Sequence, residues 1–163
     1  MQHKTPIKEK SHRLPKEFYK GQITVFYTLC IKDRKNLFVN SITVNIFVKI
    51  LREALEKFKC RDFAYVFMPD HVHLVVEGAE ESSDIWSMIK WYKQKTGYWL
   101  SQNAGNIRWQ KDYYDHIHQK KSDFITNMVY VLNNPVRKKL CDDWQKYEFI
   151  GSISYDIKDL INW

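Results

Sequence analysis

The chain has 163 residues, of which 44% are hydrophobic and 15% aromatic, so one compact domain is expected and general disorder is not. Lysine and arginine outnumber aspartate and glutamate by 26 to 19, and the resulting net charge of +7 favours a polyanionic partner such as a nucleic acid. Three scattered cysteines without a CxxC pair argue against a disulfide framework and a structural zinc site.

The two ends of the chain differ in composition from its middle. Residues 1–15 form a basic, polar arm without the apolar run of a secretory signal. No apolar stretch approaches the roughly 20 residues that a membrane span needs, so we expect a cytoplasmic protein. Residues 141–163 form a tail to which the pattern assigns no structure. The whole chain, residues 1–163, is predicted to be one domain.

The first half of the chain shows a strand, a helix and a hairpin. Residues 22–32 are rich in β-branched and aromatic side chains, which predicts a strand. Apolar residues spaced three and four apart predict an amphipathic helix over residues 43–59. Two further strands are predicted over residues 61–67 and 71–77, and the short turn between them predicts antiparallel pairing.

The second half begins with a helix predicted over residues 85–102, although Gly97 weakens the expectation that this helix is continuous. Residues 106–110 are predicted to be a short fourth strand. A last helix is expected from a cap at Ser122-Asp123 to about Asn134, since Pro135 discourages continuation.

This order of elements predicts an α+β fold of the ferredoxin-like type, a split βαβ repeat. In such a fold an antiparallel sheet carries two helices on one face. The opposite face would be open to a ligand or partner, and the last helix is an addition to the basic plan.

His71 and His73 lie two apart on a predicted strand, so their side chains project from the same face of the sheet. Val72, Leu74 and Val76 would then pack beneath the helices, which leaves the histidines on the open face. Two imidazoles so placed can reach one divalent ion, although a solvated pair is the commoner arrangement. A catalytic metal usually needs a third protein ligand.

The last helix presents Tyr130 and Asn134, four residues apart and therefore on one helical face. The phenol and the amide would be offered together to whatever lies opposite. The alternative interpretation is a surface tyrosine and a helix-capping asparagine. The expected packing stripe of this helix contains Phe124, Ile125, Met128, Val131 and Leu132.

Residues 85–103 combine lysines with aromatic residues and contain no acidic side chain. Two interpretations remain open: a nucleic-acid contact, or a helix with an aromatic core side and a solvated basic side. Tyr92 fits a core position. The members of this stripe are Trp86, Lys90, Trp91, Lys93, Lys95, Tyr98 and Trp99.

Three segments resemble a known family. MPDHVHLVV at residues 68–76 resembles the HUH core of the IS200-like, single-tyrosine (Y1) transposases, particularly the REP-associated tyrosine transposases. WQKDYYDHIH at 109–118 and YVLNNPVRKKL at 130–140 are similar to the family's tryptophan-led segment and to its NPVR motif. The resemblance covers most of residues 13–140. The chain departs from the family at His118, where many relatives have arginine, and its YEFIGS matches the family's YPWSS-like ending only loosely.

The resemblance implies a transposase that forms a 5′-phosphotyrosine intermediate on single-stranded or hairpin-containing DNA. It implies that Tyr130, on the last helix, is the nucleophile and that Asn134 joins His71 and His73 in holding Mg²⁺ or Mn²⁺. The same ligands are compatible with Zn²⁺ or Ni²⁺. A homodimer and a monomer both remain open. The candidate DNA contacts are Arg13, Lys16, Lys93, Trp109, Tyr114, His116, Arg137, Lys138 and Lys139.

Two other functions fit part of this pattern. A non-catalytic single-stranded nucleic-acid-binding module with an RNA-recognition-like fold would bind strands without a covalent product. A metal-dependent hydrolase that uses water would keep its activity after Tyr130→Phe.

Overall fold

The computed structural model describes residues 13–118 and 120–160. Most of the predicted basic arm, residues 1–15, therefore lies outside the described residues. Within the described ranges no helix combines the length and apolar character needed to cross a membrane.

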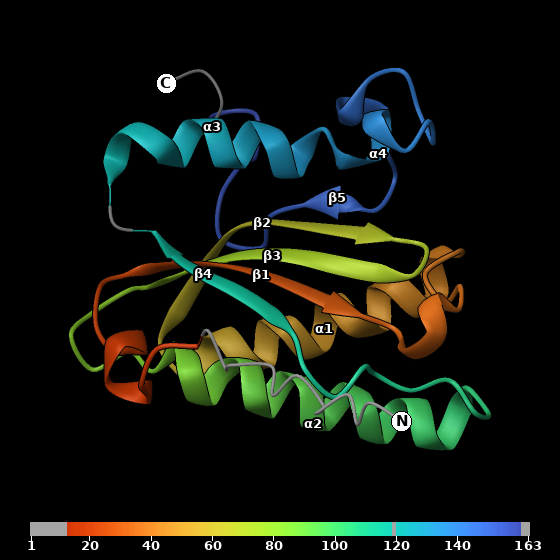
Figure 1. The fold of residues 1–163 in the computed structure, drawn as a ribbon, viewed down its shortest axis with the longest axis horizontal. Helices are drawn as coiled ribbons and strands as arrows, with labels where there is room; N and C mark the ends of the chain where they lie inside the picture. Colours follow the sequence, from red (N-terminus) through yellow and green to blue (C-terminus); the bar gives the residue numbers. More distant parts are fainter. Residues whose placement is uncertain (1–12, 119, 161–163) are drawn as a thin grey trace, which may run out of the picture.

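A five-stranded antiparallel sheet forms the middle of the molecule, with the strand order β4-β1-β3-β2-β5 (Figure 1). The first four strands and two helices follow the ferredoxin-like order, so the predicted fold class is confirmed. The central strand β3 pairs with β1 on one side and β2 on the other. The bounds are β1 Thr24–Cys30, β2 Cys60–Met68, β3 His71–Gly78, β4 Tyr114–His118 and β5 Ile150–Gly151.

Two helices, α1 (Ser41–Lys57) and α2 (Ile85–Asn103), cover one face of the sheet (Figure 1). The Asn40 side chain caps α1 by accepting from the Thr43 amide at 3.0 Å, and Asp84 caps α2 in the same way. Alternate residues of β3 are fully buried against these helices, as the sequence predicts. These buried β3 residues are Val72, Leu74 and Val76. Gly97 does not interrupt α2.

The opposite face of the sheet is not open, contrary to the prediction. The helix α3 (Lys121–Leu132) lies over it (Figure 1). Strand β2 is apolar on both of its faces, so its second face must also be removed from water. Ile125, predicted to pack, is 38% exposed. The buried cluster on this face comprises Phe26, Phe63, Ala64, Val66, Met68, Val75, Met128, Val131, Leu132 and Leu160.

The fourth strand lies later in the chain than predicted. Residues 106–110 contribute only an isolated bridge between Ile31 and Trp109, whereas β4 begins at Tyr114. The Trp109 ring packs against Phe38 and Phe47, with ring centroids 6.1 and 6.0 Å apart. This segment therefore contributes a core side chain and does not form the edge strand of the sheet.

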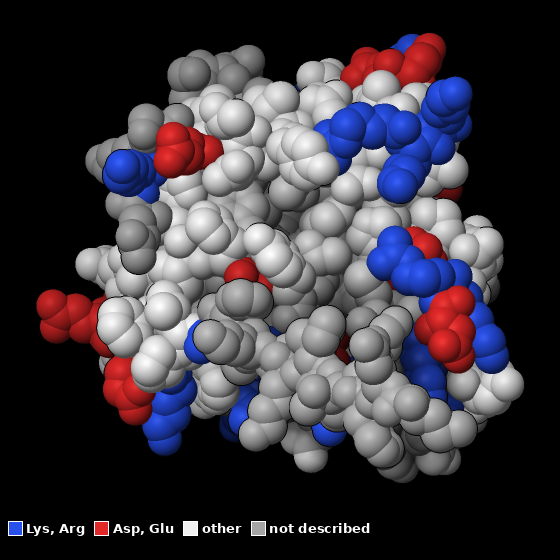
Figure 2. Space-filling view, viewed as in Figure 1, with Lys and Arg blue, Asp and Glu red and all other residues white. Residues whose placement is uncertain are grey.

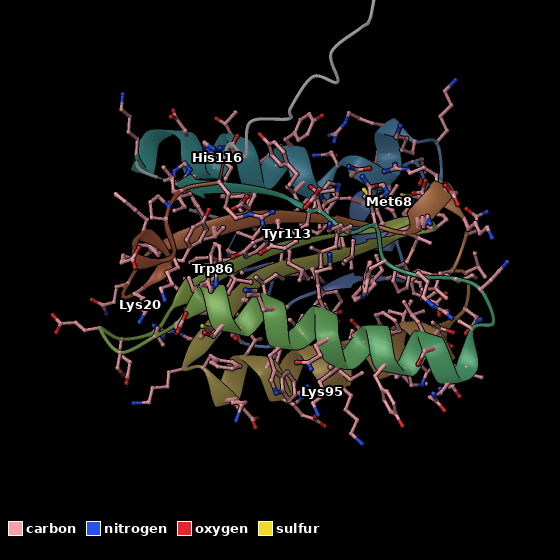
Figure 3. All side chains as sticks on the ribbon, turned by 60° about the horizontal axis from the view of Figure 1, so that its bottom comes forward. Lys20, Met68, Trp86, Lys95, Tyr113 and His116 are labelled. Atoms are coloured by element: carbon pink, nitrogen blue, oxygen red, sulfur yellow. The ribbon has the colours of Figure 1, made fainter. Side chains whose placement is uncertain are left out.

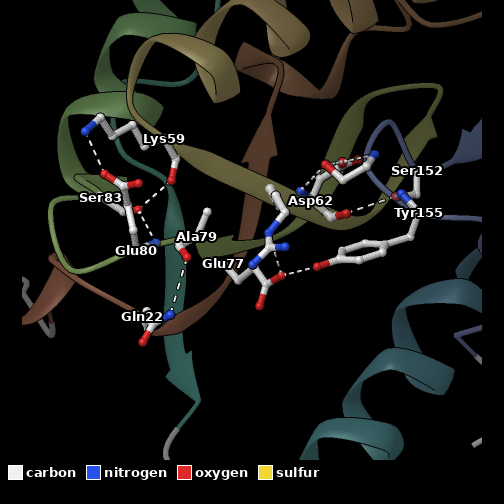
Figure 4. Close-up of polar contacts among 11 residues, drawn as sticks. Gln22, Lys59, Asp62, Glu77, Ala79, Glu80, Ser83, Ser152 and Tyr155 are labelled. Carbon is white, nitrogen blue, oxygen red and sulfur yellow. Dashed lines mark hydrogen bonds and ion pairs between the residues drawn. The ribbon is translucent and has the colours of Figure 1, made fainter.

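The last helix ends two residues earlier than expected, at Leu132, and a four-residue turn of helix, α4 (Asn134–Arg137), follows. Within the C-terminal tail, residues 150–155 lie against β2. The buried carboxylate of Asp62 accepts hydrogen bonds from the Ile153 and Ser154 amides, each with a 2.9 Å contact (Figure 4). These bonds fix residues 152–155 beside the sheet.

Candidate active site

His71 and His73 point to the same side of β3, toward α3, because alternate residues of a strand share a face. Their Nε2 atoms lie 3.2 Å apart and their rings are perpendicular. His71 is only 5% exposed and His73 is half-buried, so the pair is shielded rather than displayed on an open face. The two imidazoles are therefore brought together in a protected place.

Each imidazole is oriented by a second residue. The Nδ1 atom of His71 lies 2.6 Å from the Asp70 carboxylate, and that of His73 lies 3.0 Å from the Thr28 hydroxyl. The Asp70 carboxylate also accepts from Arg34 at 2.9 Å. A carboxylate holds the proton of His71 on Nδ1, which leaves Nε2 as an acceptor. Thr28 has no signal in the sequence, because its role depends on the pairing of β1 with β3, which sets it opposite His73.

The surroundings favour neutral imidazoles. Burial lowers the pKa of His73 to about 3, and the charges of His71, Arg137 and Arg34 act in the same direction. Burial also lowers the pKa of His71, although the Asp70 carboxylate opposes this effect. A neutral imidazole is the form that donates a lone pair to a metal.

Asn134 completes the cluster. Its Nδ2 atom lies 2.7 Å from the Nε2 of His73, and the residue is 7% exposed. Its Oδ1 atom is buried and has no hydrogen-bond partner among the described residues. An unpaired buried oxygen is costly unless another group satisfies it. Two imidazole nitrogens beside such an oxygen form a donor set that fits a divalent cation.

Tyr130 lies near the end of α3 and is 61% exposed. It lines a cavity of about 320 Å³ together with His73, and we call this the tyrosine cavity. Because α3 ends between Tyr130 and Asn134, the predicted common helical face is wrong: the amide is buried and the phenol is exposed. The cavity is lined by Phe26, Tyr27, Thr28, His73, Tyr114, His116, Asn127, Tyr130 and Val131.

Several predicted DNA contacts surround this cavity. Tyr114, 70% exposed, and His116 line it from β4. Arg137, Lys138 and Lys139 are exposed on and after α4, where lysine and arginine gather at one end of the viewed face (Figure 2). Of these cations, Arg137 lies against the ring of Tyr130.

The other predicted DNA contacts lie elsewhere. Trp109 is a packing residue, and its indole N–H donates to the buried Thr96 hydroxyl at 2.8 Å. The Lys93 ammonium donates hydrogen bonds to the backbone carbonyls of residues 110 and 111, and these bonds hold that segment against α2. Arg13 pairs with Asp115 at 3.3 Å. Lys16 lines a separate groove beside α2.

Comparisons with known proteins agree on one family. The family described as "Transposase IS200 like" matches residues 19–134. A Haemophilus influenzae protein provisionally named as a REP-associated tyrosine transposase is 22% identical, over 87% of this chain and 88% of its own. An uncharacterised protein of the same organism is 25% identical, over 78% of this chain and 88% of its own.

Two solved structures share the fold. One is a REP-associated tyrosine transposase bound to a REP hairpin, with a TM-score of 0.73, 18% identity, and coverage of 86% of this chain and 81% of that one. The other is a Deinococcus radiodurans protein provisionally named as a transposase, with a TM-score of 0.52 and 18% identity, covering 78% of this chain and 97% of that one.

Proposed function

The chain belongs to the family of IS200-like transposases, and from this premise we propose that it cuts and rejoins single-stranded DNA with Tyr130 as the nucleophile. One observation carries the proposal: Tyr130 and His73 line the same cavity, and both His71 and Asn134 contact the Nε2 atom of that histidine. A phosphate in this cavity would contact both the phenol and the cluster of nitrogen and oxygen ligands.

His71, His73 and Asn134 are the residues that would hold Mg²⁺ or Mn²⁺. When bound, such an ion supplies positive charge that stabilises the phosphate oxygens during transfer. The protein's part is to keep both imidazoles neutral by burial, to orient them through Asp70 and Thr28, and to keep the amide oxygen free for coordination.

The covalent step is a displacement at phosphorus. The phenol oxygen of Tyr130 forms a bond to phosphorus as the phenol loses its proton, and the bond from phosphorus to the 3′ oxygen breaks. The products are a 5′-phosphotyrosine and a free 3′-OH. Because the phosphodiester bond energy is retained in the tyrosine ester, another 3′-OH can reverse the reaction without an external energy source.

We further propose hairpin-containing DNA as the substrate. The related solved structure holds a REP hairpin. In this chain the exposed cation of Arg137 contacts the ring of Tyr130, and the exposed ring of Tyr114 lines the same cavity. Unstacked bases can stack on exposed rings such as Tyr114 while cations follow the backbone. A binding module without catalysis would not require the buried ligand cluster.

The proposal is tested by incubating the protein with a labelled single-stranded hairpin and Mn²⁺, followed by denaturing electrophoresis. We expect a covalent protein–DNA band in the wild type that is absent in Tyr130→Phe and in His71→Ala. Tyr98→Phe is a matched control, because Tyr98 is exposed on α2 and lines none of the cavities described here.

Two results would overturn the assignment. Cleavage that persists in Tyr130→Phe would identify water as the nucleophile and the protein as a hydrolase. A covalent band that disappears in Tyr114→Phe but persists in Tyr130→Phe would identify Tyr114, on β4, as the nucleophile.

A further inference from the structure

The α2 stripe of lysines and aromatic residues, left with two interpretations by the sequence, divides into two parts in the structure. All three tryptophans of the stripe are partly buried against the core, and Trp99 packs against Phe47 with ring centroids 5.5 Å apart. Only Trp86 and Trp91 also line a groove of about 440 Å³, which we call the tryptophan groove. The groove is lined by Lys16, Lys20, Phe58, Asp84, Trp86, Ser87, Lys90, Trp91 and Gln94.

The tryptophan groove is positively charged. Lys16, Lys20 and Lys90 are exposed, and none of them forms an ion pair within residues 13–118 and 120–160. The one acidic residue of the groove, Asp84, uses its carboxylate to cap α2 through the amide and hydroxyl of Ser87. The groove therefore presents unpaired cations that complement a phosphate chain.

One ammonium group of this groove lies beside an indole ring, since the Lys90 ammonium is 5.2 Å from the Trp86 ring centroid. The Lys95 ammonium, outside the groove lining, lies 5.4 Å from the ring centroid of Trp91. A ring beside a flexible cation matches the chemistry of a nucleotide, since a base can stack on the ring while the ammonium follows the phosphate.

A third cavity adjoins the tyrosine cavity and reaches the tryptophan groove through one ring contact. This cavity, of about 340 Å³, lies along β4 and shares His116 with the tyrosine cavity. Its wall also contains Tyr19, whose ring contacts that of Trp86 at 5.3 Å. The third cavity thus lies along the β4 edge of the sheet, and Figure 3 shows His116 near α3 and both Trp86 and Lys20 near the start of α2.

From this continuity we propose that the DNA strand extends from the tyrosine cavity, around the β4 edge, into the tryptophan groove. The groove would hold single-stranded nucleotides next to the site of cleavage, by stacking and by phosphate contacts without base-edge readout. This inference rests on the proposed function, because it assigns a second contact region to the same substrate. It predicts that long strands gain affinity from residues on α2 that short strands never reach.

The test uses fluorescence anisotropy with labelled oligodeoxythymidines from about 4 to about 16 nucleotides, a range typical of single-strand sites. The variant is Lys20→Gln/Lys90→Gln. The control is Lys49→Gln/Lys158→Gln, which removes the same charge at exposed positions outside all three cavities.

For the longest strand, the groove variant should bind about tenfold more weakly at low salt, and its slope of log affinity against log salt should fall by about 1.4 because two phosphate contacts are lost. For the shortest strand, the groove variant and the control should bind equally. Equal losses at every length, or none at any length, would overturn the extended path.

The outcome also separates this proposal from the proposed function. If the wild type forms the Tyr130 adduct but the groove variant shows no length-dependent loss, only the extended path is wrong. If the wild type binds no strand and forms no adduct, the proposed function fails and takes the extended path with it.

Discussion

The guanidinium carbon of Arg137 lies 3.7 Å from the centroid of the Tyr130 ring, and its Nη1 atom donates a 2.6 Å hydrogen bond to the Tyr130 carbonyl. One side chain therefore contacts both the backbone and the ring of the proposed nucleophile. It does so from α4, across the point where α3 ends. Arg137 fixes the direction of a phenol that is otherwise 61% exposed.

The first prediction concerns this contact. Arg137→Ala should slow formation of the covalent adduct by roughly two- to fivefold, because an exposed cation–π contact is worth about 0.5–1 kcal/mol and the ring would lose its fixed orientation. The measurement is the single-turnover rate at saturating hairpin DNA. Lys138→Gln, which removes a neighbouring charge without a ring contact, should weaken DNA affinity but leave that rate unchanged. Equal rates in Arg137→Ala and the wild type would contradict the orienting role.

The second prediction concerns the proposed metal site. Adding Mn²⁺ should raise the melting temperature of the wild type, and a concentration 100 times the dissociation constant would stabilise the fold by about 2.7 kcal/mol. His71→Ala should lose most of that rise, since it removes one of the converging ligands. Tyr98→Phe serves as the control, because Tyr98 is exposed on α2 and lines none of the three cavities. A rise of the same size in His71→Ala would mean that the ion binds elsewhere.

The sequence predicted the parts of this site that depend on local periodicity. The alternation of β3 placed His71 and His73 on one face and Val72, Leu74 and Val76 on the other, as the structure has them. The positions of strands β1 to β3 and helices α1 and α2 followed from the same kind of pattern. Each of these segments has a clear apolar repeat of its own.

The parts that the sequence did not predict depend on long-range packing. Residues 106–110 were predicted to form the fourth strand, yet Trp109 packs against the core and residues 114–118 form the edge strand that pairs with β1. The contact of Thr28 with His73 depends on the register between two strands. The burial of the histidines depends on α3 covering the second face, and no local repeat specifies where that helix docks.

The third prediction compares two glycines. A Cβ atom on Gly78 would lie 1.8 Å from the Gly21 carbonyl oxygen, whereas on Gly97 its nearest neighbour would be a Trp109 ring carbon at 3.8 Å. Gly78→Ala should therefore cost more than about 3 kcal/mol of unfolding free energy, because backbone must move. Gly97→Ala should stabilise the protein by roughly 0.5–1 kcal/mol, since glycine is unfavourable inside a helix. Urea denaturation of both variants checks the two signs, and stabilisation by Gly78→Ala would refute the close approach.

The fourth prediction concerns a buried hydroxyl. Tyr92 is fully buried in the core, and its hydroxyl has no hydrogen-bond partner among residues 13–118 and 120–160. Tyr92→Phe should raise the unfolding free energy by about 1 kcal/mol, because an unsatisfied polar atom is removed while the ring packing remains. Tyr98→Phe, on the exposed side of α2, should change it very little. A loss of stability in Tyr92→Phe would show that the hydroxyl is satisfied.

The fifth prediction concerns the attachment of the C-terminal tail. Asp62 is completely buried, and one of its carboxylate oxygens accepts from the Ser154 amide at 2.9 Å and from the Ser154 hydroxyl at 2.8 Å. The other oxygen accepts from the Ile153 amide at 2.9 Å, so in Asp62→Asn, which keeps only one accepting oxygen, the new NH₂ group would face either the Ser154 donors or the Ile153 amide. Hydrogen bonds to a charged group contribute about 1.5–3 kcal/mol each, so the variant should lose at least that much stability.

The expected loss should be concentrated at the tail. Hydrogen exchange should accelerate at the amides of Ile153 and Ser154, because both donate to Asp62, while the amides of β3 remain protected. Asp142→Asn is the control, since that carboxylate is 84% exposed and forms only a surface pair with Lys146. Since the tail contacts β2 and not the tyrosine cavity, Asp62→Asn should still form the covalent adduct below its melting temperature. Unchanged exchange at Ile153 and Ser154 would show that other contacts hold the tail.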